Sequence, residues 1–89
     1  MARVELGPVL DLRAAAPLYA ELASFKGQEL VIDASCVERM GGLCVQILLA
    51  AQQSWKRDGL AWSVVDPSAA FSESATLMAC SELLWREAA

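Results

Sequence analysis

Two stretches of the chain carry apolar residues at the spacing of an α-helix. In residues 12–25 the apolar stripe consists of Ala15, Leu18, Leu22 and Phe25. A proline costs least in a first helical turn, where its missing N–H has no helical partner to lose, so Pro17 predicts a helix that begins near Ala14. Gly27 predicts the end of this helix, because glycine readily adopts the left-handed conformation common there.

The second and stronger helical pattern covers residues 43–56. Its apolar stripe consists of Cys44, Ile47, Leu48, Ala51 and Trp55. Its polar side is formed mostly by Gln46, Gln52, Gln53, Lys56 and Arg57. The period of about 3.6 residues predicts a helix with one buried and one solvated face, which ends at the turn Asp58-Gly59.

Short β-favouring runs separate these helices. Residues 30–32 form a continuous apolar run, which is typical of a strand buried on both faces of a parallel sheet, and residues 60–65 predict a second central strand. Residues 4–10 predict one kinked strand or two short pieces, because Gly7-Pro8 interrupts them. The alternation of strands and helices predicts an α/β fold.

Helical structure is also expected after residue 65. Asp66-Pro67 has the form of an N-cap followed by proline at the first helical position, and it predicts a third helix that reaches about Met78. Phe71 and Ala75 share one side of that helix with Met78. Residues 81–85 are a candidate for a last short helical piece.

Composition narrows the range of functions. The 89 residues suit one domain, and an apolar fraction of 56% is ample for a packed core. The net charge is −4 and the basic residues are scattered, which argues against nucleic acid and anionic membranes as partners. No apolar run is long enough to span a bilayer, and the first residues do not resemble a signal peptide, so we expect a cytoplasmic protein without membrane insertion.

Catalytic chemistry is difficult to build from these residues. The chain has no histidine to act as a general base near neutral pH, and Gly41-Gly42 does not match a phosphate-binding loop. Asp33 and Glu38 could form a carboxylate pair, but the simpler interpretation is that Asp33 accepts backbone hydrogen bonds at a strand end and Glu38 is solvated. We therefore expect no enzymatic activity, no cofactor and no metal.

Cysteines and tryptophans are interpreted mainly as core residues. Cys36, Cys44 and Cys80 are odd in number and lack a CxxC pair, which favours reduced thiols packed in the core. Trp55 belongs to an apolar stripe, whereas Trp62 is open to either a buried or an exposed position. Trp85 is the best candidate for an exposed anchor.

The most informative segment is residues 31–51, VIDASCVERMGGLCVQILLAA. It resembles the signature of STAS domains, roughly D-L-S-x-V-x-x-M-D-S-S-G-L-G-V-L-L-x-A, at Asp33, Ser35, Val37, Met40, Leu48, Leu49 and Ala51. Residues 10–17 and 64–68 are similar to two further motifs of the family. The resemblance implies a single STAS domain over residues 1–89, with a mixed, mostly parallel sheet of about four strands packed by about three to four helices.

The segment departs from the family where the long helix begins. Anti-sigma factor antagonists of the family carry a phosphorylated serine or threonine there, but residues 41–44 contain no hydroxyl. The resemblance therefore implies partner binding without the usual phosphorylation switch. The expected partner-binding residues are Glu38, Arg39, Met40, Gly41, Gly42, Leu43 and Gln46. Gly41-Gly42 is expected to permit a tight turn with positive φ and to leave helix N–H groups accessible, and Leu43 is either an exposed anchor or core.

The resemblance implies a non-catalytic protein–protein interaction module in bacterial signalling. Its partner would be a kinase-type regulator, either of the anti-sigma type or a chemotaxis histidine kinase. An alternative is a small STAS subunit that regulates the ATPase of a lipid-transport ABC complex. A small enzyme or ligand carrier is a third hypothesis, which requires a polar pocket with a titratable group.

Overall fold

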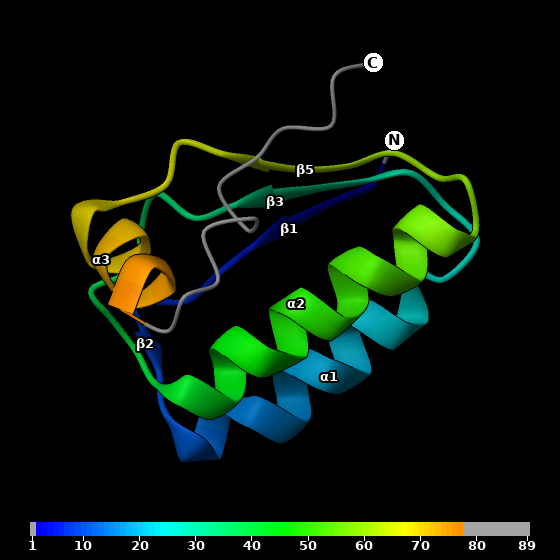
Figure 1. The fold of residues 1–89 in the computed structure, drawn as a ribbon. Helices are drawn as coiled ribbons and strands as arrows, with labels where there is room; N and C mark the ends of the chain where they lie inside the picture. The colour runs from blue at the N-terminus through cyan, green and yellow to red at the C-terminus, as the bar shows by residue number, and fades with distance from the viewer. Residues whose placement is uncertain (1, 78–89) are drawn as a thin grey trace.

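A parallel sheet forms the centre of the computed structural model, which describes residues 2–77 (Figure 1). In that part of the chain β3 (Leu30–Asp33) lies between β1 (Ala2–Glu5) and β5 (Trp62–Val65). Ile32 is paired with Val4 on one side and with Val64 on the other, and all three side chains are buried. The predicted adjacency of the 30–32 and 60–65 segments in one sheet is confirmed.

A second, smaller sheet lies at one end of the first. It pairs β2 (Val9–Leu10) with β4 (Arg39–Met40), again in parallel. The prediction for residues 4–10 is resolved as two strands that belong to different sheets, with Gly7-Pro8 between them. The predicted α/β architecture is confirmed, and its strands divide between these two sheets.

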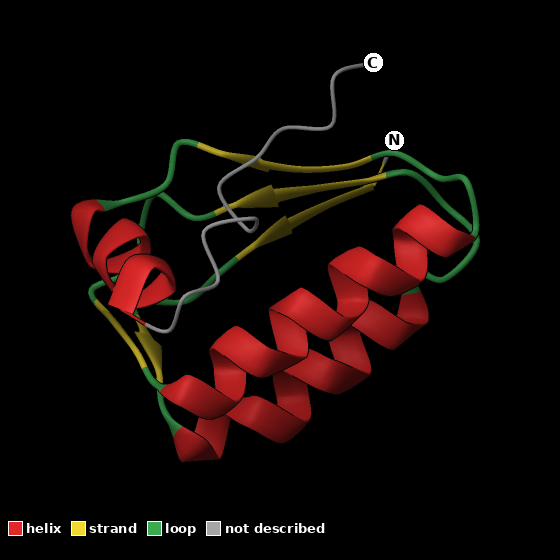
Figure 2. Ribbon diagram, in the orientation of Figure 1, coloured by secondary structure: helices red, strands yellow, loops and turns green. Residues whose placement is uncertain are grey.

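Two long helices cover one face of the central sheet and lie side by side (Figures 1 and 2). They are α1 (Ala15–Ser24), which follows the 3-10 turn η1 (Leu12–Ala14), and α2 (Gly42–Arg57). Both helices return the chain from the end of one strand to the start of the next parallel strand, so they run in the same direction. The shorter α3 (Ala69–Leu77) lies beyond the ends of the strands, against β4.

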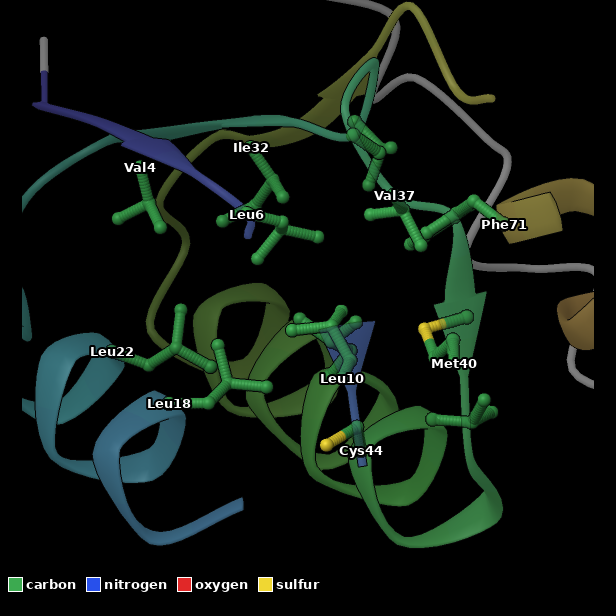
Figure 3. Close-up of a cluster of buried hydrophobic side chains, with 14 of the residues drawn as sticks. Val4, Leu6, Leu10, Leu18, Leu22, Ile32, Val37, Met40, Cys44 and Phe71 are labelled. Atoms are coloured by element: carbon green, nitrogen blue, oxygen red, sulfur yellow. The ribbon is translucent and has the colours of Figure 1, made fainter. Parts of the chain in front are cut away.

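The core lies between the central sheet and the α1–α2 layer, and it extends toward α3 (Figure 3). Leu18 and Leu22 enter it from α1, and Cys44 enters it from α2. The strands contribute alternate residues: Leu30 and Ile32 are fully buried, while their neighbours in β3 are half-buried. The sequence predicts that residues 30–32 form a strand buried on both faces, but Val31 is only half-buried; the described helices α1 and α2 cover one face of this sheet.

Several predicted helix boundaries agree with the structure. α1 begins at Ala15, so Pro17 lies in its first turn, and Gly27 has the left-handed backbone (φ +89°) expected after a helix end. The turn after α2 likewise has a left-handed Gly59 (φ +70°). Met78 and the segment 81–85 lie outside the described residues.

Two details of the helices correct the sequence-based interpretation. Asp66 does not cap α3; it has φ +49°, and Ser68 is the cap, because its hydroxyl accepts a hydrogen bond from the Phe71 N–H. Gln52, assigned to the polar side of α2, is buried. It follows Leu48 by four residues and therefore lies on the core face of the helix.

Candidate interaction surface

The predicted partner-binding residues lie at the end of the molecule where α2 begins. We use the name α2 corner for residues 38–43 together with Gln46. Backbone hydrogen bonds hold this segment against the β2 region: the N–H groups of Glu38 and Arg39 donate to the Pro8 carbonyl oxygen at 2.7 and 3.0 Å, and the Gly41 N–H donates to the Leu10 carbonyl oxygen at 2.9 Å. Short paired strands thus deliver the start of α2 to the edge of the molecule.

Serines at the cap and within α3 hold this segment and the residue before it from another direction. Ser68 Oγ donates to the Val37 carbonyl oxygen at 2.6 Å, and Ser74 Oγ donates to the Met40 carbonyl oxygen at 3.1 Å. Both acceptors are backbone groups, so α3 fixes the path of the loop rather than the rotamer of any one side chain. The α2 corner is therefore held between β2 and α3.

Most of the predicted partner-binding residues face outward. Residues that are exposed are Glu38, Arg39, Gly41, Leu43 and Gln46, and Gly42 is half-buried. Met40 differs: its side chain is buried in the core, as Figure 3 shows, and its exposed fraction is 8%. β4 alternates between outward Arg39 and inward Met40, so the side chain of Met40 is not presented on this surface.

The two glycines do not form a turn with positive φ. Gly41 is extended (φ −86°, ψ 167°) and Gly42 is the first residue of α2, so the expected left-handed turn is absent from this segment. A Cβ at Gly41 would meet the Leu10 carbonyl oxygen at 3.6 Å, which is an ordinary contact. Within the described residues no side-chain hydrogen bond caps the start of α2.

An exposed apolar side chain is present in the α2 corner. Leu43, left open between core and surface by the sequence, is 49% exposed. A second exposed leucine, Leu12 of η1, is 76% exposed, and η1 packs against the start of α2 through the hydrogen bond from Cys44 Sγ to the Asp11 carbonyl oxygen (3.5 Å). The sequence did not single out Leu12 as exposed. Residues 12–14 form a 3-10 turn before α1, so Leu12 is not part of the apolar face of that helix.

The remaining chemistry near the corner fits a structural role. The Ser35 N–H donates to Asp33 Oδ1 at 2.9 Å and Arg3 Nη2 contacts Asp33 Oδ2 at 2.6 Å, which confirms the interpretation of Asp33 as an acceptor at a strand end. Hydrogen bonding by Ser35, and then the Arg3 guanidinium, holds the pKa of Asp33 below its ordinary value. Glu38 is exposed, as expected.

The cysteines divide between core and surface. Cys44 is buried, and burial, followed by the negative charge of Asp11, raises the pKa of its thiol, which makes it a poor nucleophile. Cys36 is exposed in the turn after β3, so the prediction that this thiol is packed in the core is wrong. Cys80 lies outside the described residues. Among the described residues no group of three or more potential ligands is arranged to hold a metal ion.

Both described tryptophans are buried. Trp55 is core, and its Nε1 donates to the Gln28 carbonyl oxygen at 2.6 Å. Trp62, which the sequence left open, is also buried, and its ring centroid lies 5.7 Å from that of Trp55. Trp85 lies outside the described residues.

Comparison with known proteins gives the family. A search of the curated proteins gave no match, and a search of the solved structures gave none. The described helices include none that is long and apolar enough to cross a membrane. A family model described as "Mlab, STAS domain" matches residues 1–85, and the three-helix, mostly parallel α/β architecture of the described residues is consistent with it. On this match the chain belongs to the STAS domain family.

Proposed function

We propose that this protein is a non-catalytic interaction module that binds a regulatory protein in the bacterial cytoplasm through the α2 corner. STAS domains commonly mediate protein interactions in signalling. The observation that carries the proposal is the exposure of Leu43 at a helix start whose backbone is held on both sides. An apolar side chain held outward by a rigid segment gains contacts in a complex at little cost in ordering.

The proposed partner is a kinase-type regulator, either of the anti-sigma type or a chemotaxis histidine kinase. Polar and charged side chains surround Leu43, since Glu38, Arg39 and Gln46 are exposed on the same corner. An apolar centre with a polar rim is the usual composition of a specific, reversible protein interface. Mixed charges at the rim favour a protein surface over a uniformly anionic partner.

A second candidate is the ATPase of a lipid-transport ABC complex, with this protein as its regulatory subunit. The observation that favours it is the absence of a hydroxyl in residues 41–44, since STAS subunits of this kind do not depend on phosphorylation in the same way as anti-sigma factor antagonists. With either partner we expect residues 40–46 to stay unmodified when the protein is incubated with a cognate kinase and ATP.

Affinity capture from the native cell tests the proposal. The immobilised wild-type protein is compared with Leu43→Glu and with Ala20→Glu, which changes an exposed residue of α1 outside the α2 corner. We expect the wild type and Ala20→Glu to retain one kinase-type regulator, and Leu43→Glu to lose it. Recovery of an ABC ATPase with the same variant pattern supports the second candidate.

Two results contradict the proposal. In one, a partner is captured equally by the wild type and by Leu43→Glu, which places the interface elsewhere. In the other, no kinase-type regulator and no ABC ATPase is retained. Mass spectrometry of the eluted proteins, with the folded state of each bait checked by circular dichroism, distinguishes these outcomes.

A further inference from the structure

The solvent side of the two long helices carries a groove that lies mostly outside the surface used by the proposed function. It runs between α1 and α2, has a volume of about 380 Å³, and shares Gln46 with the α2 corner. Its base includes the apolar side chains of Leu22, Ile47 and Trp55, and the exposed ring of Tyr19 stands at its side. Apolar surface is therefore accessible along the seam between two parallel helices.

Small residues create this groove. Ala23 on α1 and Ala50 and Ala51 on α2 all line it, and larger side chains at these positions would occupy part of its volume. Side chains of one helix pack into the spaces between side chains of another, at interaxial distances of about 8–10 Å. The groove lined by these residues lies between α1 and α2, which cover one face of the sheet (Figure 1).

The groove has a positively charged residue at one of its ends. Among the described residues that line it, Lys26 alone carries a charge, and it stands just beyond the C-terminal end of α1. Its Nζ lies 3.9 Å from Asp58 Oδ2, and both side chains are about half exposed, so this ion pair is weak and the ammonium group can pair with a second carboxylate as well. The complementary ligand is apolar along most of its length and acidic at one end.

We propose that the α1–α2 groove binds an amphipathic helix of a protein partner, whose apolar side chains lie over Ala23 and Ala50 and whose carboxylate pairs with Lys26. A helix that binds in an apolar groove does so through apolar side chains at positions i, i+3 or i+4, and i+7, which lie on one face of the helix. This inference does not rest on the α2 corner, and it holds or fails whichever partner binds there.

A synthetic peptide serves as the probe. It has about 15 residues, enough for marginal helix formation, with leucines at i, i+4 and i+7 and one terminal glutamate. A sister peptide carries glutamine in place of that glutamate. Binding to the full chain is followed by calorimetry, and the contacted residues are located by amide chemical shifts in NMR spectra. We expect the largest shifts at Ala23, Ala50 and Ala51.

Variants of the protein separate shape from charge. Ala50→Arg fills the groove and is expected to weaken peptide binding about tenfold or more, whereas Ala20→Arg, an exposed alanine of α1 that does not line the groove, changes it less than about twofold. Lys26→Gln is expected to weaken the glutamate peptide about threefold and to leave the glutamine peptide unchanged.

Three results overturn the inference. The first is the absence of saturable binding by either peptide, or binding indifferent to Ala50→Arg. The second is a set of shifts at the same residues caused by sodium laurate but not by the peptides, which assigns the groove to an acyl chain. The third is self-association in analytical ultracentrifugation that Ala50→Arg abolishes, which assigns it to a second copy of this chain. Failure here leaves the capture experiment at Leu43 unaffected.

Discussion

Ser68 Oγ donates a hydrogen bond to the carbonyl oxygen of Val37 at 2.6 Å and accepts one from the N–H of Phe71 at 3.1 Å. One hydroxyl thus caps α3 and also fixes the loop that leads into the α2 corner. Because the two bonds share an atom, the stability of α3 and the position of the loop are coupled. The further bond from Ser74 Oγ to the Met40 carbonyl oxygen strengthens that coupling.

Removal of this hydroxyl is expected to loosen the loop before it affects the core. Ser68→Ala loses the cap of α3 and leaves the Val37 carbonyl without its donor, which should lower the free energy of unfolding by about 1–3 kcal/mol. Amide hydrogen exchange at residues 38–41 should accelerate more than exchange in β3. Ser68→Thr keeps a hydroxyl and is the matched control. Equal acceleration in the loop and in β3 would contradict a local role.

Whether the Leu43 side chain is exposed can be tested by the free energy of unfolding of variants. Leu43→Glu places a charged group at a half-exposed position in the first turn of α2, where a carboxylate is favourable, so its effect should stay within about 0.5 kcal/mol. Leu48→Ala, on the core face of the same helix, should cost about 2–5 kcal/mol. Urea denaturation measures both. A loss of more than about 2 kcal/mol for Leu43→Glu would mean that this side chain is core after all.

The sequence was sufficient to predict the main elements, because they follow from short-range patterns. The stripe in residues 43–56 predicts α2, Pro17 lies in the first turn of α1, and Gly27 lies in the turn after its end. The α/β order follows from the alternation of these patterns. Each depends on residues within one or two turns of each other, where the spacing of side chains determines which face is buried.

The errors fall where tertiary contacts override local signals. Asp66-Pro67 has the form of a helix start, but the Val37 carbonyl binds the hydroxyl of Ser68 and makes that residue the cap. Met40 is next to exposed residues in sequence, yet its pairing with Leu10 turns its side chain inward. The groove between α1 and α2 had no sequence signal, because it depends on which alanines of two separate helices meet.

The two described cysteines should differ in reactivity. Cys36 is exposed, whereas Cys44 is buried and burial raises the pKa of its thiol. Under native conditions iodoacetamide should modify Cys36 at least about tenfold faster than Cys44, and denaturant should remove most of the difference. Peptide mass mapping assigns each modified thiol, and a Cys36→Ser variant serves as the control. Equal native rates would show that the start of α2 opens readily.

Asp33 should contribute to the acid sensitivity of the fold. Its pKa is lowered in the folded protein, so its contribution to stability is present above the unfolded pKa and is lost as the pH falls through the folded value. Asp33→Asn should therefore be less stable than wild type at neutral pH, and the difference should shrink below about pH 4. Urea denaturation from pH 7 to pH 2.5 measures this, with Glu38→Gln as an exposed control. A gap that stays constant with pH would exclude this role.

Trp55 and Trp62 lie in contact but differ in hydrogen bonding. Trp55 Nε1 donates to the Gln28 carbonyl oxygen, whereas Trp62 Nε1 is buried without an acceptor in the described part of the chain. Replacement of either residue by phenylalanine removes similar ring volume, so the comparison isolates the N–H group. Trp55→Phe loses a hydrogen bond. Trp62→Phe removes a buried N–H that has no acceptor, and with it a desolvation cost of about 1–3 kcal/mol. We expect Trp62→Phe to be the more stable variant by at least about 1 kcal/mol in urea denaturation. The opposite order would mean that a buried water or another acceptor pairs with Trp62 Nε1, because deletion of an N–H lowers stability only when that N–H makes a hydrogen bond.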